Sequence, residues 1–281
     1  MPSEVGQVRF TVRRGSPARE YFHYIPASAS ARSAVIVLVH GVTRRAAEHI
    51  FQFRTLADRA GAILVAPYFS RSAFGLYQQV VDPKSGVRAD LALFDMLDEI
   101  GKRTGASTER VHLFGYSGGA QFVHRFVMLH PERAASMLVA SAGWYTFPDE
   151  QLPYPYGIAS APVPNMEIDP RRFLAVERHL LIGAQDNSRG DNLRVSAKID
   201  ALQGTNRVER ARRWFDAMAD ASRRHNVQPP RATFELIPGI GHSFATSARR
   251  RSLPERVMSH IFPEIPDFRQ KRGTMPCKNF D

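Results

Sequence analysis

Apolar residues along this chain follow two patterns that alternate with one another. Short, nearly continuous apolar runs lie at 34–39, 62–66, 110–114, 135–140, 179–182 and 232–237. Between them, apolar residues recur at helical spacing in the segments 46–60, 89–102, 120–129, 208–224 and 243–261. Continuous runs are typical of strands buried on both faces, and strands that alternate with helices form parallel sheets. The pattern predicts an α/β fold, with a mainly parallel central sheet, helices on both of its faces and ligands beyond the carboxyl ends of the strands.

The beginning of the chain has a different pattern. Residues 7–12 and 20–25 alternate between apolar and polar side chains on either side of Gly15-Ser16-Pro17. Such alternation around a turn is typical of an antiparallel pair, so we expect an N-terminal hairpin. A chain of 281 residues with 43% apolar residues can build one large domain or two small ones. Because strands and helices alternate throughout the middle, we take residues 1–281 as a single domain.

Two stretches interrupt the alternation, each directly after a predicted strand. Residues 144–170 are rich in proline and aromatic side chains, and residues 185–206 are mostly polar. Long loops in compact domains often carry function. We interpret 144–170 as a loop or partial cap over the site at the strand ends; a linker or a simple surface excursion is the alternative.

Positive charge dominates the ionisable residues. A net charge of +11 would suit nucleic acid or an acidic membrane as a partner. The arginines, however, are spread from Arg9 to Arg272 and fall in no recognisable nucleic-acid-binding module. We therefore expect no nucleic-acid partner.

Cysteine content and hydropathy bear on the compartment. Cys277 is the only cysteine, which makes an intrachain disulfide impossible. The first residues lack the apolar core of a signal peptide, and no apolar run reaches the length of about 18 residues that crosses a bilayer. We expect a cytoplasmic protein without a transmembrane segment, although removal of an export signal would leave the same sequence.

The run 110–114 leads into Gly115-Tyr116-Ser117-Gly118-Gly119, and helical spacing follows. In a G-x-S-x-G turn between a strand and a helix, the outer glycines let the two backbones pass closely, and the strained serine exposes its Oγ. The five-residue pattern alone is common. Its place between a strand and a helix predicts a nucleophile elbow centred on Ser117.

A serine hydroxyl becomes a good nucleophile only when a base removes its proton and a third group orients that base. In this type of fold the acid and then the histidine follow the serine, each at a strand end. Asp186 follows the run 179–182, and His242 follows the run 232–237 and a glycine-rich loop. We predict Ser117, Asp186 and His242 as a catalytic triad, with Asp191 and Asp149 as the alternative acids.

Acyl transfer also needs hydrogen-bond donors for the oxyanion of the tetrahedral intermediate. The backbone N–H of Gly118 follows the nucleophile at a helix N-terminus, where the dipole favours negative charge. A second donor is expected in the turn after the run 34–39, and we assign it to the backbone N–H of Val42. We expect the side chain of His40 to brace this turn, while Thr43 could add a hydroxyl or cap the next helix.

Together, His40-Gly41-Val42, the GYSGG turn, Asp186 and the sequence GIGHSF resemble the α/β-hydrolase superfamily from about Val35 to Phe262. Within it, the short HG turn and the serine-glycine-glycine-alanine elbow are similar to polyhydroxybutyrate-depolymerase-like and feruloyl-esterase-like hydrolases. The resemblance implies a Ser-His-Asp carboxylic-ester hydrolase that needs no cofactor and no metal. Secreted depolymerases of that group carry disulfides and polymer-binding appendages, which this chain lacks. We therefore expect a small soluble ester as the substrate.

A serine esterase is thus our primary hypothesis. A thioesterase, a peptidase or an acyltransferase would use the same triad, and a catalytically inactive binding protein on this scaffold is the non-enzyme alternative. Four aromatic residues follow predicted strands and either line the pocket or pack in the core: Tyr68, Phe69, Trp144 and Tyr145. Three arginines could bind a substrate carboxylate or form ordinary ion pairs: Arg171, Arg189 and Arg207.

Overall fold

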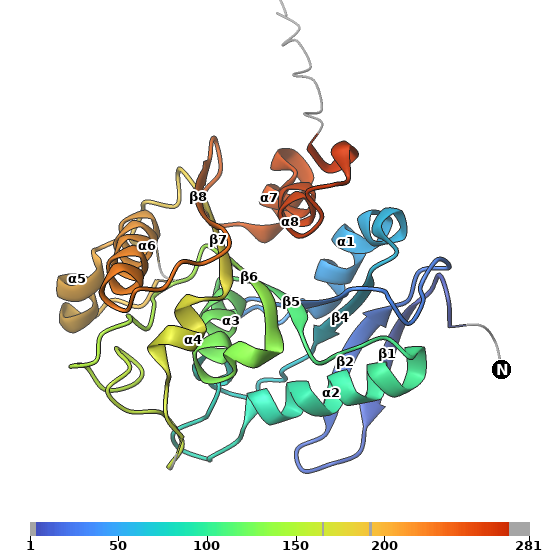
Figure 1. The fold of residues 1–281 in the computed structure, drawn as a ribbon, viewed down its shortest axis with the longest axis horizontal. Helices are drawn as coiled ribbons and strands as arrows, with labels where there is room; N and C mark the ends of the chain where they lie inside the picture. Colours follow the sequence, from blue (N-terminus) through green and yellow to red (C-terminus); the bar gives the residue numbers. More distant parts are fainter. Residues whose placement is uncertain (1–3, 165, 191–192, 270–281) are drawn as a thin grey trace, which may run out of the picture.

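The computed structural model describes residues 4–164, 166–190 and 193–269 and is built around one sheet (Figure 1). Its strands are β1 (Val8–Arg13), β2 (Arg19–Tyr24), β3 (Val35–Val39), β4 (Ile63–Pro67), β5 (Val111–Tyr116), β6 (Ala134–Ala140), β7 (Glu177–Gly183) and β8 (Ala232–Ile237). Its helices are α1 (Ala46–Ala60), α2 (Ala89–Thr104), α3 (Gly118–Leu129), α4 (Pro170–Leu174), α5 (Ala197–Gln203), α6 (Arg207–Arg224), α7 (Phe244–Arg251) and α8 (Leu253–Ile261). Short 3-10 helices are η1 (Tyr77–Gln79), η2 (Pro131–Arg133) and η3 (Pro266–Arg269).

The strand order in the sheet is β1-β2-β4-β3-β5-β6-β7-β8. Strands β1 and β2 form an antiparallel hairpin, with Val8 opposite Tyr24, and β2 continues antiparallel to β4. All pairs from β4 to β8 are parallel. The predicted parallel sheet with an N-terminal antiparallel hairpin is therefore confirmed. Parallel strands end at the same edge of a sheet, so the loops after β3, β5, β7 and β8 meet there.

Helices cover both faces of the sheet, as the apolar runs predict. Alternate residues of β3 belong to different cores: Val37 packs on the side of α2, α3 and α6, and Ile36 on the side of α1, α7 and α8. Figure 1 shows these two groups of helices on opposite sides of the sheet. Because both faces are covered, every residue of β3 and β4 is buried, which explains why their sequences are continuously apolar.

The last predicted helix differs from the observed one. The prediction of a continuous helix over 243–261 is wrong, because α7 ends at Arg251 and α8 starts at Leu253. Ser252 between them has left-handed backbone angles, φ 53° and ψ 40°. Pro254 follows in the first turn of α8, where its missing N–H and its ring are tolerated, whereas inside a longer helix they would break the hydrogen-bond ladder.

One short helix follows the first irregular stretch and another lies inside the second, and periodicity indicated neither. Helix α4 follows Asp169, whose carboxylate accepts the backbone N–H groups of Arg171 and Arg172 and so caps the helix. Helix α5 lies inside 185–206 and has seven residues, too few for a period of 3.6 to stand out.

Among the described residues, no helix is both long enough and apolar enough to cross a membrane.

Candidate active site

The turn from β5 into α3 holds Ser117 with φ 55° and ψ −112°, a conformation that a residue with a side chain rarely adopts. The outer glycines make the turn possible. A Cβ on Gly115 would lie 2.2 Å from the carbonyl oxygen of Gly119, and one on Gly119 would lie 2.0 Å from that of Val39. Only glycine fits at either position. The side chain of Ser117 therefore stands at the carboxyl edge of the sheet, on the N-terminus of α3.

The structure brings Ser117, His242 and Asp186 together in a hydrogen-bonded series. The Oγ of Ser117 lies 3.0 Å from Nε2 of His242, and Nδ1 of the same ring lies 2.8 Å from Oδ2 of Asp186. In the tautomer that satisfies both contacts, Nδ1–H donates to the carboxylate and Nε2 accepts the serine O–H. The Asp186 carboxylate is buried, while the His242 side chain keeps 21% of its exposure. A base in this position can take the serine proton and remain accessible to a substrate.

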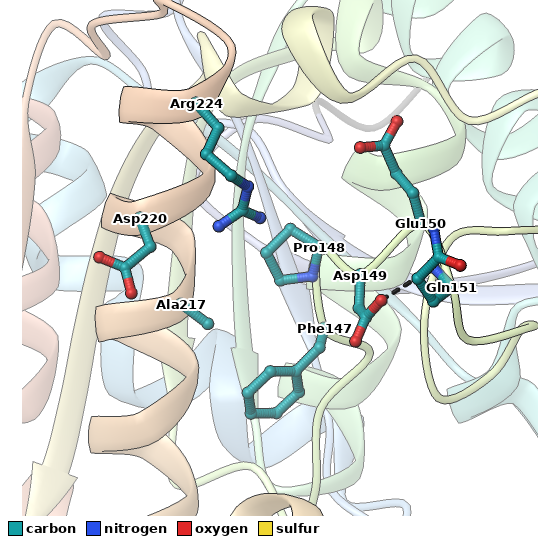
Figure 2. Close-up of a pocket in the computed structure, with 8 residues that line it drawn as sticks. All are labelled: Phe147, Pro148, Asp149, Glu150, Gln151, Ala217, Asp220 and Arg224. Atoms are coloured by element: carbon teal, nitrogen blue, oxygen red, sulfur yellow. Dashed lines mark hydrogen bonds between the residues drawn. The ribbon is translucent and has the colours of Figure 1, made fainter.

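Asp149, one of the two alternative acids, does not take this place. Asp149 lies in a separate cavity of about 410 Å³ between residues 147–151 and α6, where its carboxylate accepts the backbone N–H of Gln151 at 2.8 Å (Figure 2). Asp191 lies outside the described residues. Of the described carboxylates, Asp186 is the one hydrogen-bonded to His242.

The backbone at Gly118 and Val42 is close together beside the serine. A Cβ on Gly118 would lie 3.2 Å from the Val42 nitrogen, and one on Gly41 would lie 3.4 Å from the Cβ of Ser117. The two predicted oxyanion donors thus belong to segments in contact. Gly118 is also the first residue of α3, whose leading N–H groups have no acceptor within the helix. An oxygen beside Ser117 Oγ can receive hydrogen bonds at this point.

A buried histidine fixes the turn that carries Val42. His40 donates through Nδ1–H to the carbonyl of Gly41 at 2.8 Å and accepts the backbone N–H of Phe69 through Nε2 at 3.1 Å. The Tyr77 hydroxyl donates to the His40 carbonyl at 2.7 Å. Burial lowers the pKa of His40 to about 4, so the ring is neutral, as both contacts require. The contacts of Tyr77 leave no trace in the sequence pattern, because η1 lies far along the chain from the turn that it supports.

A cavity of about 240 Å³ opens at Ser117. Three segments surround it: the turn after β3 together with the start of α1, the elbow at Ser117, and the His242 loop together with the start of α7. Its lining residues are Gly41, Val42, Thr43, Arg45, Glu48, His49, Tyr116, Ser117, His242, Ser243, Phe244 and Ala245. Tyr116 and Phe244 are thus its aromatic walls, and sequence reasoning missed both.

The four aromatic residues predicted at the pocket are not among those lining residues. Phe69 and Tyr145 are core residues: Phe69 stacks on Tyr77, and Tyr145 stacks on Trp214. Trp144 is buried, and its ring centroid lies 4.2 Å from the guanidinium carbon of Arg125 and 5.3 Å from that of Arg194. Tyr68 is half-buried and packs near His40 and Phe10. The surroundings of these four residues fit the alternative interpretation, that their side chains pack against other side chains instead of lining the pocket.

The three arginines considered as binders of a substrate carboxylate lie in different environments. Arg171 is exposed on α4, and Arg189 forms an ion pair with Asp200 at 2.7 Å. Arg207 is buried and lies 3.2 Å from Oδ1 of Asp186, the carboxylate oxygen that does not face His242. An arginine on the acid of the series is a feature that sequence reasoning did not find, because no local pattern links residues 186 and 207.

Comparisons with known proteins place this architecture. No protein-family model and no curated protein sequence matches the chain. Among solved structures, a poly(aspartic acid) hydrolase from Sphingomonas sp. KT-1 is similar, with a TM-score of 0.75, 23% identity, and coverage of 92% of this chain and 97% of the other. A poly(3-hydroxybutyrate) depolymerase from Bordetella parapertussis has a TM-score of 0.74 and 24% identity, and the match covers 92% of this chain and 91% of the other. An S-formylglutathione hydrolase from Agrobacterium tumefaciens has a TM-score of 0.58 and 14% identity, and the match covers 90% of this chain and 92% of the other.

The class of structure follows from the strand order and these likenesses. The chain has the α/β-hydrolase fold that its sequence resembles, and its structural neighbours are esterase-like proteins of that fold.

Proposed function

We propose that this protein is a serine hydrolase that cleaves a carboxylic ester through an acyl-enzyme intermediate. Ser117 is the nucleophile, His242 the acid and base, and Asp186 the group that orients His242. The backbone N–H groups of Gly118 and Val42 form the oxyanion hole, and no cofactor takes part. The observation that carries the proposal is the hydrogen-bonded series from Ser117 to Asp186, with contacts of 3.0 and 2.8 Å, at the floor of an open cavity.

The reaction follows from the order of these contacts. His242 Nε2 takes the hydroxyl proton as Ser117 Oγ attacks the ester carbonyl, and the oxyanion that forms faces the two backbone donors. The imidazolium then gives its proton to the alkoxide, and the alcohol leaves. Water attacks the acyl-enzyme by the same route in reverse, and the acid is released. The buried carboxylate of Asp186 stabilises the imidazolium at each stage.

The size of the cavity supports a small substrate. Pockets for drug-sized ligands measure about 300–1,000 Å³, and this one measures about 240 Å³. Solved structures of similar fold include a ferulic acid esterase and an acetyl xylan esterase, which supports an ester as the scissile group. A thioesterase, a peptidase or an acyltransferase would share the mechanism as far as the acyl-enzyme and differ in leaving group or acceptor.

The test compares two serine variants that lie at opposite ends of β5. Ser117→Ala should abolish p-nitrophenyl acetate hydrolysis and fluorophosphonate labelling while the circular dichroism spectrum stays unchanged. Ser107→Ala changes an exposed serine before β5 and should retain both. Hydrolysis by Ser117→Ala at the wild-type rate would refute the assignment. Folded wild-type protein that neither hydrolyses the ester nor takes up the label would favour a binding protein on this scaffold.

Substrate chemistry needs a second assay on the wild-type protein. A panel of p-nitrophenyl esters of graded acyl length, with matched thioesters and peptide amides, separates the reaction classes. We expect the highest kcat/KM for short oxygen esters, because the cavity is small. Faster turnover of a thioester or an amide with the same acyl group would replace the esterase assignment with the corresponding alternative.

A further inference from the structure

Asp186 has two side-chain neighbours, one for each carboxylate oxygen. His242 faces Oδ2 at 2.8 Å, and Nη1 of Arg207 faces Oδ1 at 3.2 Å. The side chains of Arg207 and Asp186 keep only 3% and 1% of their exposure, so water screens this pair very little. A charge that is permanent at any accessible pH therefore lies one carboxylate away from the imidazole.

We propose that Arg207 is a positioning residue for the reaction, acting through Asp186. It holds the buried carboxylate in the orientation that presents Oδ2 to His242. The inference rests on the proposed function, because it assigns a role within that same series of residues.

The first step of the argument is the cost of the buried carboxylate. An ionised carboxylate without a partner is unstable in an apolar interior, and it becomes protonated or turns toward any available donor. Asp186 receives a neutral N–H from His242 in the resting state, which leaves its negative charge uncompensated from that side. Arg207 supplies the missing charge at the other oxygen. With both oxygens engaged, the plane of the carboxylate is defined from two sides.

The second step is the rigidity of the element that carries Arg207. It is the first residue of α6, and the preceding Asn206 caps the helix by accepting the backbone N–H of Glu209 at 3.0 Å. The Glu209 carboxylate in turn accepts the backbone N–H of Thr205 at 2.8 Å, so the start of α6 is tied to the loop before it. An arginine at a helix start that is held in this way can orient a neighbour.

Arg210 provides a matched control. It is fully buried on the same helix and pairs with Asp200 at 2.7 Å, but it has no contact with the series of Ser117, His242 and Asp186. Loss of either arginine removes an ion pair formed by a buried guanidinium and lowers stability. Loss of Arg207 also removes a charge that contacts the Asp186 carboxylate, whereas loss of Arg210 does not.

The experiment measures kcat and KM for p-nitrophenyl acetate at pH 7 in wild type, Arg207→Gln, Arg207→Lys and Arg210→Gln. Rates are expressed per site titrated with a fluorophosphonate, so that partial unfolding does not enter the comparison. For Arg207→Gln we expect kcat to fall by roughly tenfold with KM nearly unchanged, because a carboxylate held from one side no longer fixes the imidazole, and a small misplacement of a catalytic group is felt in the transition state. Arg207→Lys should restore kcat, and Arg210→Gln should leave kcat and KM at their wild-type values.

The outcomes separate the two proposals. If wild type is active and Arg207→Gln has the same kcat per titrated site, Arg207 has no positioning role while the serine hydrolase stands. An equal loss of kcat in Arg210→Gln would also overturn the inference, because the effect would then be a general loss of rigidity. If Arg207→Gln does not fold, Arg207→Met keeps the apolar length without the charge and carries the same expectation. A wild-type protein that is neither labelled nor active overturns both.

Discussion

The strained backbone at Ser117 yields a quantitative prediction about stability. At φ 55° and ψ −112°, a residue with a Cβ pays a conformational penalty of about 1–3 kcal/mol, whereas glycine adopts this region without steric cost. Glycine loses more backbone entropy on folding, by roughly 0.5–1 kcal/mol. Ser117→Gly should therefore be about 0.5–2 kcal/mol more stable than Ser117→Ala, although both lack the nucleophile.

Urea unfolding measures this difference directly. Trp144 and Trp214 are both buried, so their fluorescence reports the transition, and a change of midpoint at constant slope is a change of stability. Ser252 supplies the control, because its φ of 53° and ψ of 40° fall in the ordinary left-handed region, where a side chain costs less. The gain from alanine to glycine should be larger at 117 than at 252. Equal stability of Ser117→Gly and Ser117→Ala would refute the argument that the elbow stores strain.

Three further predictions concern packing, pH and capping. Gly119→Ala should give no active folded protein, because its Cβ would lie 2.0 Å from the Val39 oxygen, whereas Gly190→Ala, with no atom within 4 Å, should match wild type in circular dichroism and activity. Burial lowers the pKa of His49 to about 3, so as the pH falls below about 6.5 this histidine takes up a proton only in the unfolded chain. His49→Phe should therefore reduce the loss of unfolding free energy at acid pH by about 1.4 kcal/mol per pH unit. An unchanged slope of unfolding free energy against pH, measured by urea titration, would contradict this. Asn206→Ala removes the cap of α6 and should cost about 1 kcal/mol in the same assay; no loss would mean that the cap is dispensable.

Much of the fold could be predicted because its signals are local. The runs at 34–39 and 62–66 are apolar throughout because both faces of their strands are covered, and the hairpin alternates because it lies at the sheet edge. The break at Ser252 could not be seen in the same way. Apolar periodicity continues across it into α8, and the single Pro254 is compatible with either a kink or a new helix.

In the candidate site, too, some residues could be predicted from local sequence signals, and others depended on tertiary packing. The glycines around Ser117 mark the elbow in the sequence, because their lack of a Cβ is a requirement of the turn itself. The selection of Asp186 over Asp149 depends on which strand end lies beside β8, and that is a property of the sheet order. The aromatic walls Tyr116 and Phe244 were missed for a related reason, since a strand-end aromatic can face either the cavity or the core.

The sequence by itself determined the α/β class, the elbow at Ser117 and the chain order in which an acid and a histidine follow it, because backbone sterics and periodicity act over a few residues. Only the tertiary structure decided that Asp186 faces His242 with one oxygen and Arg207 with the other. Those contacts join residues 56 and 21 positions apart in the chain. Their geometry is set by how β7, β8 and α6 pack, and no short stretch of sequence encodes that packing.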